Sequence, residues 1–156
     1  MLFALSAHLI WAPLLFRIFT PEILIADSAA VQMMLGLLRP DISVIGTTFS
    51  AGNGHTVTLV GACSSFQNIS IASLAAVSVT MLVRPYWVRR DFLWLLAICV
   101  TMVAINVVRI GVLAWSFENY LYWHNGVGSQ LLALFQTIIV AGMSYLGARS
   151  GVNARE

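Results

Sequence analysis

The sequence predicts an all-α integral membrane protein with about four transmembrane helices. Hydrophobic residues make up 60% of the 156 residues, charged residues make up 9%, and the mean hydropathy is +0.89. About a quarter of the residues of a soluble domain are charged, because its surface must stay in water. The eight arginines and six acidic residues of this chain cannot cover such a surface, so most of it must face lipid.

Four apolar segments are each close to the roughly 20 residues that cross a bilayer core. They cover residues 2–19, 64–83, 92–115 and 127–148. Four such helices and their connections account for the length, so we expect residues 1–156 to form a single transmembrane domain. The first segment lacks the basic start and the cleavage site of a signal peptide, so we expect it to be a retained helix.

The positive residues indicate how the spans are oriented. Five of the eight arginines lie in the turn between the second and third spans or after the fourth: Arg84, Arg89, Arg90, Arg149 and Arg155. The positive-inside rule places these two regions in the cytoplasm, so residues 20–62 and the loop around Glu118 face outward. None of the positive runs is long enough to predict binding of nucleic acid.

The outward segment is expected to begin with a helix. Residues 20–22 read Thr-Pro-Glu, which is typical of a helix start, and the helix runs to about Leu38. Asp27, Ser28 and Gln32 form a thin polar face, which favours an interfacial or re-entrant helix. A fifth span is the competing interpretation, and Asp27 and the short apolar length oppose it.

A short β-hairpin is expected after this helix. Two β-rich runs, ISVIGTTFS and HTVTLV, flank the Gly/Asn turn of residues 51–54. We expect His55 to be exposed in the hairpin, which leads directly to Cys63 and would cover a site there.

Three chemically capable side chains are predicted to meet at the outer membrane face. Cys63 lies at the outer end of the second span, Arg109 in the outer half of the third, and His124 at the start of the fourth. Alternating helix directions bring these three positions to one face whichever side is outside. Ionisable residues are costly within spans, so they are candidates for function.

These residue types fit nucleophilic catalysis. A thiol reacts as its thiolate, which a position in the first turn of a helix favours, as expected for Cys63. His124 can act as a base and then protonate a leaving amine, while Arg109 can hold an oxyanion or a substrate carboxylate. Asn106 lies one helical turn before Arg109 and could orient it, and Gln67 lies one turn after Cys63 as a supporting residue.

Each of these residues also has a structural interpretation. A single cysteine in an apolar helix usually packs as a small core residue, which is our expectation for Cys99. An arginine near a helix end often extends to the headgroups, as expected for Arg17, and an interfacial histidine is often an anchor. Arg109 is harder to explain in this way, because six residues separate it from the next loop.

At three motifs the chain resembles the exosortase/archaeosortase family of membrane-embedded cysteine transpeptidases. The motifs are Ala-Cys-Ser-Ser at residues 62–65, Asn-Val-Val-Arg-Ile at residues 106–110 and Tyr-Trp-His at residues 122–124. Their order and spacing match the family from about Ile42 to the C-terminus. Ser65 stands where the family has a glycine after Cys-Ser, which indicates a divergent subgroup.

The resemblance implies that Cys63 is the nucleophile, that Arg109 and His124 are its catalytic partners, and that Ser64 is a supporting residue. The substrates would be exported proteins with a C-terminal sorting tail made of a short signature, an apolar helix and a basic cluster. The enzyme would cleave at the signature, on the outer face of the plasma membrane, and pass the acyl group to an acceptor. Lipid and substrate are the expected partners. No cofactor or metal is expected, because one Cys and one His on different helices are too few ligands for a zinc site.

Two other functions compete with this enzyme. A scaffold or assembly subunit for the export of a cell-surface polymer needs only the bundle, with the three side chains as contacts between helices. A small transporter is disfavoured, because the sequence has no internal repeat and no broken helix pair at mid-membrane. An enzyme requires the thiol, the guanidinium and the imidazole to come together at a cleft.

Overall fold

The computed structural model describes residues 9–10, 12–52, 54–84 and 86–152. The helical elements are α2 (Ala12–Leu38), the 3₁₀ turn η2 (Gly61–Cys63), α3 (Ser65–Val83), α4 (Arg89–Trp115), α5 (Phe117–Tyr120), the π-helical turn η3 (Leu121–Asn125) and α6 (Val127–Val152). The strands are β1 (Ser43–Ile45), β2 (Thr48–Ser50) and β3 (Thr56–Thr58). The protein is therefore mostly helical with a small sheet.

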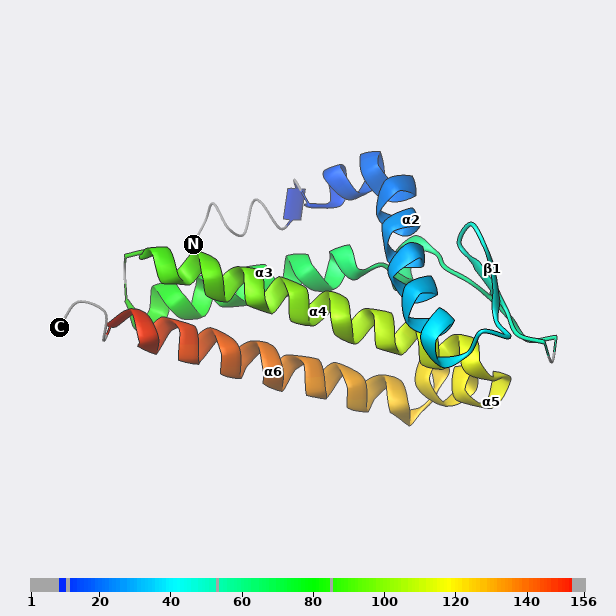
Figure 1. Ribbon diagram of the computed structural model, residues 1–156. Coiled ribbons are helices and arrows are strands. Elements are labelled where there is room, and N and C mark those ends of the chain that lie inside the picture. The colour runs from blue at the N-terminus through cyan, green and yellow to red at the C-terminus, as the bar shows by residue number, and fades with distance from the viewer. Residues whose placement is uncertain (1–8, 11, 53, 85, 153–156) are drawn as a thin grey trace.

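Helices α3, α4 and α6 form the body of the molecule and lie side by side along most of their lengths (Figure 1). Small residues of α3 and larger residues of α4 and α6 fill the space between them; the buried ones are Ala72, Ala76, Ile98, Met102 and Val140. The sheet, α5 and η3 lie at one end of this bundle, and the last turns of α6 lie at the other.

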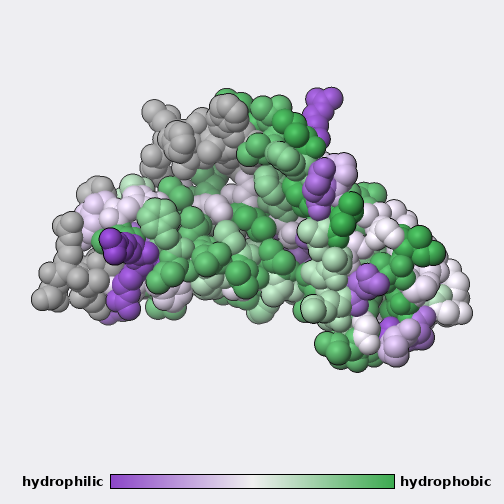
Figure 2. Space-filling view, turned by 45° about the horizontal axis from the view of Figure 1, so that its top comes forward, coloured by the Kyte–Doolittle hydropathy of each residue, from purple (hydrophilic) through white to green (hydrophobic). Residues whose placement is uncertain are grey.

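Three helices in the described part of the chain are long and apolar enough to cross a membrane: Ser65–Val83, Arg89–Trp115 and Val127–Ser150. They correspond to the last three predicted spans. Figure 2 shows a broad hydrophobic surface over the bundle, with hydrophilic residues mainly toward the ends and on α2. Such a surface requires lipid around it, so the chain is a membrane protein.

Helix α2 differs from the predicted helix start at residues 20–22. The helix is continuous through this point and bends at Phe19, which has non-helical dihedral angles (φ −103°, ψ 15°). Pro21 lacks an N–H group and its ring collides with the preceding turn, so it kinks the helix instead of beginning one. The Thr20 hydroxyl donates to the carbonyl of Phe16 and does not cap a helix.

Helix α2 crosses the bundle steeply near the end that carries the sheet (Figure 1). It is not among the three described helices that could cross a membrane. The predicted first span, residues 2–19, lies partly outside the described residues. A fourth span and an interfacial position of residues 21–38 therefore stay predictions.

The sheet contains the predicted hairpin and one further strand. It is antiparallel in the order β1-β2-β3, so the first β-rich run forms two strands instead of one. Gly46 (φ +60°) and Gly54 (φ +83°) lie in the two turns, where positive φ favours glycine. The sequence prediction missed the first reversal, because Gly46 was read as part of a strand.

A hydrophobic cluster attaches α2 and the sheet to the end of α4. Its buried members are Val31, Leu35, Ile42, Phe49, Ala51, Leu59, Ile110 and Ala114. The hydroxyl of Ser28 on α2 also donates to the carbonyl of Gly46 at 2.6 Å. These contacts fix the sheet beside the start of α3, where Cys63 lies.

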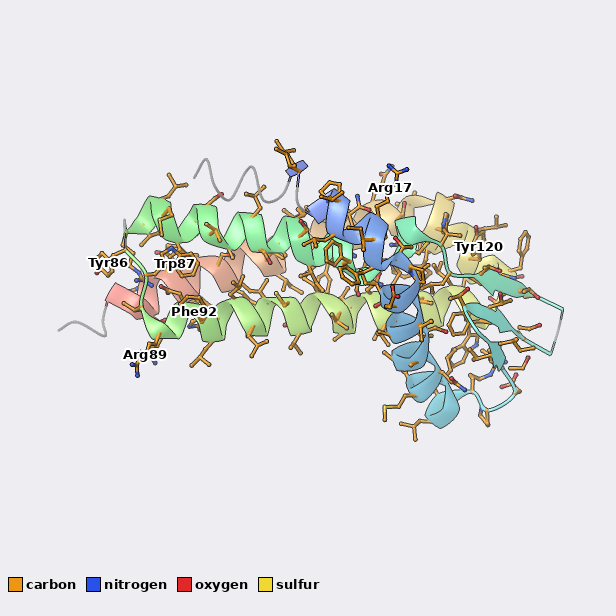
Figure 3. The ribbon with its side chains drawn as sticks, turned by 90° about the horizontal axis from the view of Figure 1, so that it is seen from above. Arg17, Tyr86, Trp87, Arg89, Phe92 and Tyr120 are labelled. Carbon is orange, nitrogen blue, oxygen red and sulfur yellow. The ribbon has the colours of Figure 1, made fainter. Side chains whose placement is uncertain are left out.

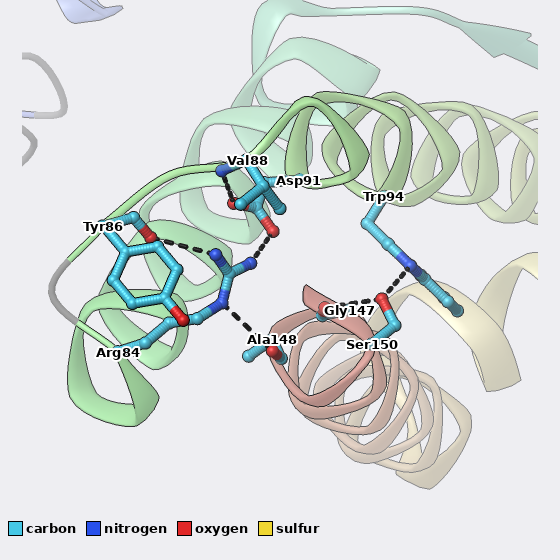
Figure 4. Close-up of polar contacts among 8 residues, drawn as sticks. All are labelled: Arg84, Tyr86, Val88, Asp91, Trp94, Gly147, Ala148 and Ser150. Carbon is cyan, nitrogen blue, oxygen red and sulfur yellow. Dashed lines mark hydrogen bonds and ion pairs between the residues drawn. The ribbon is translucent and has the colours of Figure 1, made fainter. Parts of the chain in front are cut away.

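A buried polar cluster, which we call the Arg84 cluster, joins the three bundle helices at the end opposite the sheet (Figure 4). Nε of Arg84 donates to the carbonyl of Ala148 at 3.1 Å, and Nη1 donates to the carbonyl of Tyr86 at 3.0 Å. Nη2 forms an ion pair with Asp91, whose other oxygen accepts the N–H of Val88 at 2.8 Å. Each charged side chain is only 2% exposed.

Exposed aromatic and arginine side chains also lie at this end of the bundle. Figure 3 shows Trp87, Arg89 and Phe92 grouped there, far from Tyr120 at the sheet end. The rings of Trp87 and Phe92 are tilted against each other with centroids 5.5 Å apart. An exposed mixture of aromatic and arginine side chains is typical of a membrane interface. Arg84, however, is not part of it, because its charge is paired inside the protein.

Candidate active site

Cys63 is the last residue of a short turn that enters α3. Its N–H donates to the carbonyl of Val60 at 2.8 Å, and its carbonyl accepts a hydrogen bond from Nδ2 of Asn106 at 3.0 Å. The N–H of Ser64 donates to the carbonyl of Gly61 at 3.1 Å. The backbone is therefore held on both sides of the thiol, and we call residues 61–65 the Cys63 turn.

The position of Cys63 differs from the one predicted in the first turn of the helix. Ser64 is the N-cap of α3, and its side chain accepts the N–H of Phe66 at 3.1 Å. Serine is favoured there because its short side chain reaches the free N–H groups of a helix start. Cys63 precedes the helix, so the helical spacing that related it to Gln67 does not hold. Gln67 is exposed.

A cavity of about 500 Å³, which we call the Cys63 cavity, opens beside this turn. Cys63 lines it together with His55, Thr56, Val57, Thr58, Leu59, Val60, Ile110, Leu113, Phe117, Tyr120 and His124. Strand β3 and the residues around it form one wall, and the ends of α4 and α5 form others. The structure thus brings the predicted thiol and imidazole to one cavity at the sheet end of the bundle.

His124 enters this cavity from η3. Its Nδ1 lies 2.9 Å from Oδ1 of Asn125. An amide oxygen only accepts hydrogen bonds, so in this arrangement Nδ1 is the donor, and in a neutral imidazole Nε2 would be the nitrogen that can take up a proton. The imidazole also stacks on the ring of Tyr120, with centroids 4.8 Å apart. Asn125 thus orients the imidazole ring, a contact that was not predicted although Asn125 directly follows the histidine.

His55 attaches the sheet to the bundle and is not the exposed hairpin residue that was expected. Its Nε2 lies 2.9 Å from the carbonyl of Leu113 near the end of α4. Its ring meets Phe117 and Tyr120 edge-on, with centroids 5.9 Å away in each case. The wall of the Cys63 cavity is therefore anchored next to the residues that support His124.

Arg109 faces a different space from Cys63. It lines a groove of about 350 Å³ between α4 and α6, which we call the Arg109 groove; the other lining residues are Ala104, Ile105, Val108, Val112, Trp123, Leu132 and Phe135. Nε of Arg109 is buried and has no hydrogen-bond partner among the described residues. Trp123 and His124 are consecutive in η3, so this turn separates the groove from the Cys63 cavity.

Asn106 connects Cys63 to α4. It is fully buried, and its amide N–H group bonds to Cys63 and not to Arg109, as had been expected. Its Oδ1 is buried without a hydrogen-bond partner among the described residues. Asn106 therefore supports the Cys63 turn, and an acceptor is left free beside it.

Asp27 is a further residue at the site that the sequence analysis placed elsewhere. It was expected on a thin polar face of an interfacial helix. Its carboxylate is instead buried against the start of α3, where Oδ2 accepts the N–H of Ser65 at 2.9 Å and Oδ1 accepts the Ser65 hydroxyl. A single acidic residue in an apolar helix was the signal, because such a charge needs a partner.

One exposed ion pair lies beside the connection from α2 to the sheet. Nε and Nη2 of Arg39 donate to the two carboxylate oxygens of Asp41 at 2.7 and 2.6 Å. These hydrogen bonds lower the pKa of Asp41 and raise the pKa of Arg39. The guanidinium of Arg39 also lies 4.7 Å from the centre of the Trp115 ring.

The comparison with protein families agrees with the resemblance at the three motifs. A family model described as transmembrane exosortase matches residues 1–141, which is most of the chain. Neither the curated proteins nor the solved structures give a significant match. The match covers the Cys63 turn, α4 and the His124 turn together, and the chain therefore belongs to the transmembrane exosortase family.

Proposed function

We propose that this protein is a cysteine transpeptidase or protease that processes the C-terminal sorting tails of exported proteins at the outer face of the plasma membrane. The observation that carries the proposal is the shared cavity of Cys63 and His124, which brings a nucleophile and an oriented base together at one end of the bundle. Membership of the exosortase family supports the same reaction class.

The first step is the attack of the Cys63 sulfur on the carbonyl carbon at the tail signature. His124 takes the thiol proton at Nε2 as the C–S bond forms, and returns it to the departing nitrogen as the C–N bond breaks. The product is an acyl thioester and a free amine. An acceptor nucleophile, either water or a group on the cell surface, then attacks the thioester and restores the thiol.

The oxyanion of this step needs a side-chain donor, because the nearby backbone N–H groups are already used. Those of Cys63 and Ser64 bond to backbone carbonyls, and that of Ser65 bonds to Asp27. Arg109 is our candidate, since its buried Nε lacks an acceptor. It lines the neighbouring groove, so this role requires the guanidinium to turn past Trp123 when substrate binds.

The Arg109 groove also fits the apolar part of a tail. The groove lies along a candidate span, and its lining is apolar except for Arg109. A tail helix placed there would lead its extended signature across η3 to the thiol, and the carbonyls of the signature would pass the free Nε. We therefore place the substrate across η3, with the apolar helix on one side and the scissile bond on the other.

The test is a deletion strain in which envelope proteins are compared by the masses of their C-terminal peptides. Proteins with a matching tail should accumulate uncut. The wild-type gene and Cys99→Ala should restore cutting, whereas Cys63→Ala should not, because it removes the covalent path. Removal of one sulfur costs about 1 kcal/mol of stability, so the variant should still insert and fold. Cutting by Cys63→Ala at the parental level would overturn the proposal and favour a scaffold.

The proposed location has its own test. A topology reporter fused after Arg90 should report the cytoplasm, and one fused at Asn119 should report the outside, because exposed Arg89 and Arg90 mark the cytoplasmic end. The same compartment for both fusions would contradict the predicted orientation.

A further inference from the structure

Asp27 is a buried carboxylate beside the Cys63 turn that the proposed reaction does not use. It is 5% exposed, and both of its oxygens accept hydrogen bonds from Ser65, which is also 5% exposed. A buried charge is costly unless hydrogen bonds replace its water. The pair of bonds to one residue satisfies the carboxylate and at the same time fixes the position of that residue.

The carboxylate acts as a cap that comes from another helix. The first N–H groups of a helix have no partner within it. In α3, the side chain of Ser64 accepts the N–H of Phe66, and Asp27 of α2 accepts the N–H of Ser65. The partial positive charge at a helix start stabilises a carboxylate placed there. Asp27 therefore ties α2 to the first residue of α3.

This contact lies two residues after the thiol. The backbone of the Cys63 turn is bonded to Val60 and Asn106 before that point and to Asp27 after it. The side chain of Cys63 lines the cavity between these fixed points. The hydroxyl of Ser65 gives Asp27 a second donor beside the backbone N–H of the same residue.

We propose that Asp27 is a positioning residue for Cys63: it fixes the end of the Cys63 turn and thereby sets where the thiol lies in the cavity. The proposal rests on the proposed function only in taking this thiol as the nucleophile. Without the carboxylate, the turn is released at one end. The thiol then becomes more open to small reagents and less well placed for a bound carbonyl.

The reactivity of the thiol tests this without any substrate. The full chain in detergent is treated with N-ethylmaleimide, and the modification of Cys63 and Cys99 is followed separately by peptide mass spectrometry. Asp27→Ala should raise the rate at Cys63 about threefold or more, because a locally released segment reacts from its open form. Cys99 lies in α4 away from the turn, and its rate should not change.

Two further variants allow the same measurement if Asp27→Ala folds poorly. Asp27→Asn keeps one carbonyl oxygen for the Ser65 N–H, so its rate should lie between those of the parent and Asp27→Ala. Ser65→Ala removes one donor from the other side and should resemble Asp27→Asn. Glu22→Gln is the matched control, because it removes an exposed charge from the same helix, and it should change nothing.

A second readout is the processing of a tail substrate found in the deletion strain. Asp27→Asn should lower kcat about tenfold with little change in KM, since misplacement of a reacting atom affects the chemical step. Faster alkylation together with slower processing supports the proposal. An unchanged Cys63 rate in all three variants would overturn it, as would an equal rise at Cys63 and Cys99 with a lower unfolding midpoint. If Cys63→Ala still processes substrate, the proposed function fails, while the alkylation result still decides the role of Asp27.

Discussion

The two ends of the helical bundle differ in how their buried guanidinium groups are paired. In the Arg84 cluster, all three guanidinium nitrogens of Arg84 and both oxygens of Asp91 have partners. Toward the Cys63 end, Nε of Arg109 and Oδ1 of Asn106 are buried without a partner among the described residues; at the Arg84 end this holds for the uncharged hydroxyl of Ser144. Unmade hydrogen bonds are costly in a buried site. The buried guanidinium of Arg84 is satisfied within the protein, whereas the free Nε of Arg109 fits the substrate-binding role proposed above.

The largest effect on stability is expected from breaking the ion pair in the Arg84 cluster. Asp91→Ala leaves the Arg84 guanidinium buried without its counter-ion, which should lower the free energy of unfolding by about 3–5 kcal/mol. The measurement is denaturant or thermal unfolding in detergent. Arg84→Met combined with Asp91→Leu removes both charges and should recover much of the loss. A change below about 1 kcal/mol in Asp91→Ala would mean that the pair behaves like an exposed one.

A variant of Arg109 should lose processing activity but keep its stability. Arg109→Lys keeps the charge but loses the planar fork and its Nε–H, so processing should fall about a hundredfold, as when an oxyanion donor is removed. The unfolding midpoint should change little, because the lost Nε–H has no partner within the part of the chain that the structure describes. Near-normal processing would show that Arg109 supplies only charge or has no catalytic role.

A smaller effect is expected from the group that orients the base. Asn125→Ala frees Nδ1 of His124, so the wrong tautomer becomes accessible. Processing should fall about tenfold, which is part of the 10²–10⁴ that general acid–base catalysis contributes. Asn125→Asp keeps an acceptor and should retain more activity. Equal activity of Asn125→Ala and the parent would exclude an orienting role.

The smallest effect concerns the exposed pair of Arg39 and Asp41. The pKa of Asp41 is lowered in the folded chain, so its contribution to stability is present above the unfolded pKa and is lost as the pH falls through the folded pKa. Asp41→Asn should therefore lower the unfolding midpoint slightly at neutral pH and not at all in strong acid. A large difference at neutral pH would show that this exposed pair matters more than exposed pairs usually do.

The spans could be predicted because a helix that crosses the lipid core must carry mainly apolar side chains. Residues 64–83, 92–115 and 127–148 must be apolar over about 20 positions, and this pattern needs no knowledge of the neighbours. The meeting of Cys63 and His124 follows from the alternation of helix directions. Neither prediction required knowledge of contacts between segments that are far apart in the sequence.

The details that failed depend on contacts between distant segments. The sequence alone does not show that Pro21 bends a helix, because a proline at the first position of a helix has the same local pattern. Asp27 was assigned to a thin polar face and not to a buried contact because its partner, Ser65, lies 38 residues away. Arg109 was expected beside Cys63 from helix ends alone, but the rotation of α4 about its axis decides which cavity each residue lines.

In the π-helical turn η3, the number of residues decides which side chain lines which cavity more than the identity of those residues does. Consecutive residues of a helix point about 100° apart, so Trp123 and His124 can line different cavities. Deletion of one residue from Leu121–Asn125 would tighten the π turn into an ordinary α-helical one and rotate every side chain after it. If the deleted residue precedes Trp123, His124 would take the position of Trp123, on the side of the Arg109 groove and away from the thiol. Substitutions within η3 leave this geometry in place, whereas a change of one residue in its length moves the imidazole from one cavity toward the other.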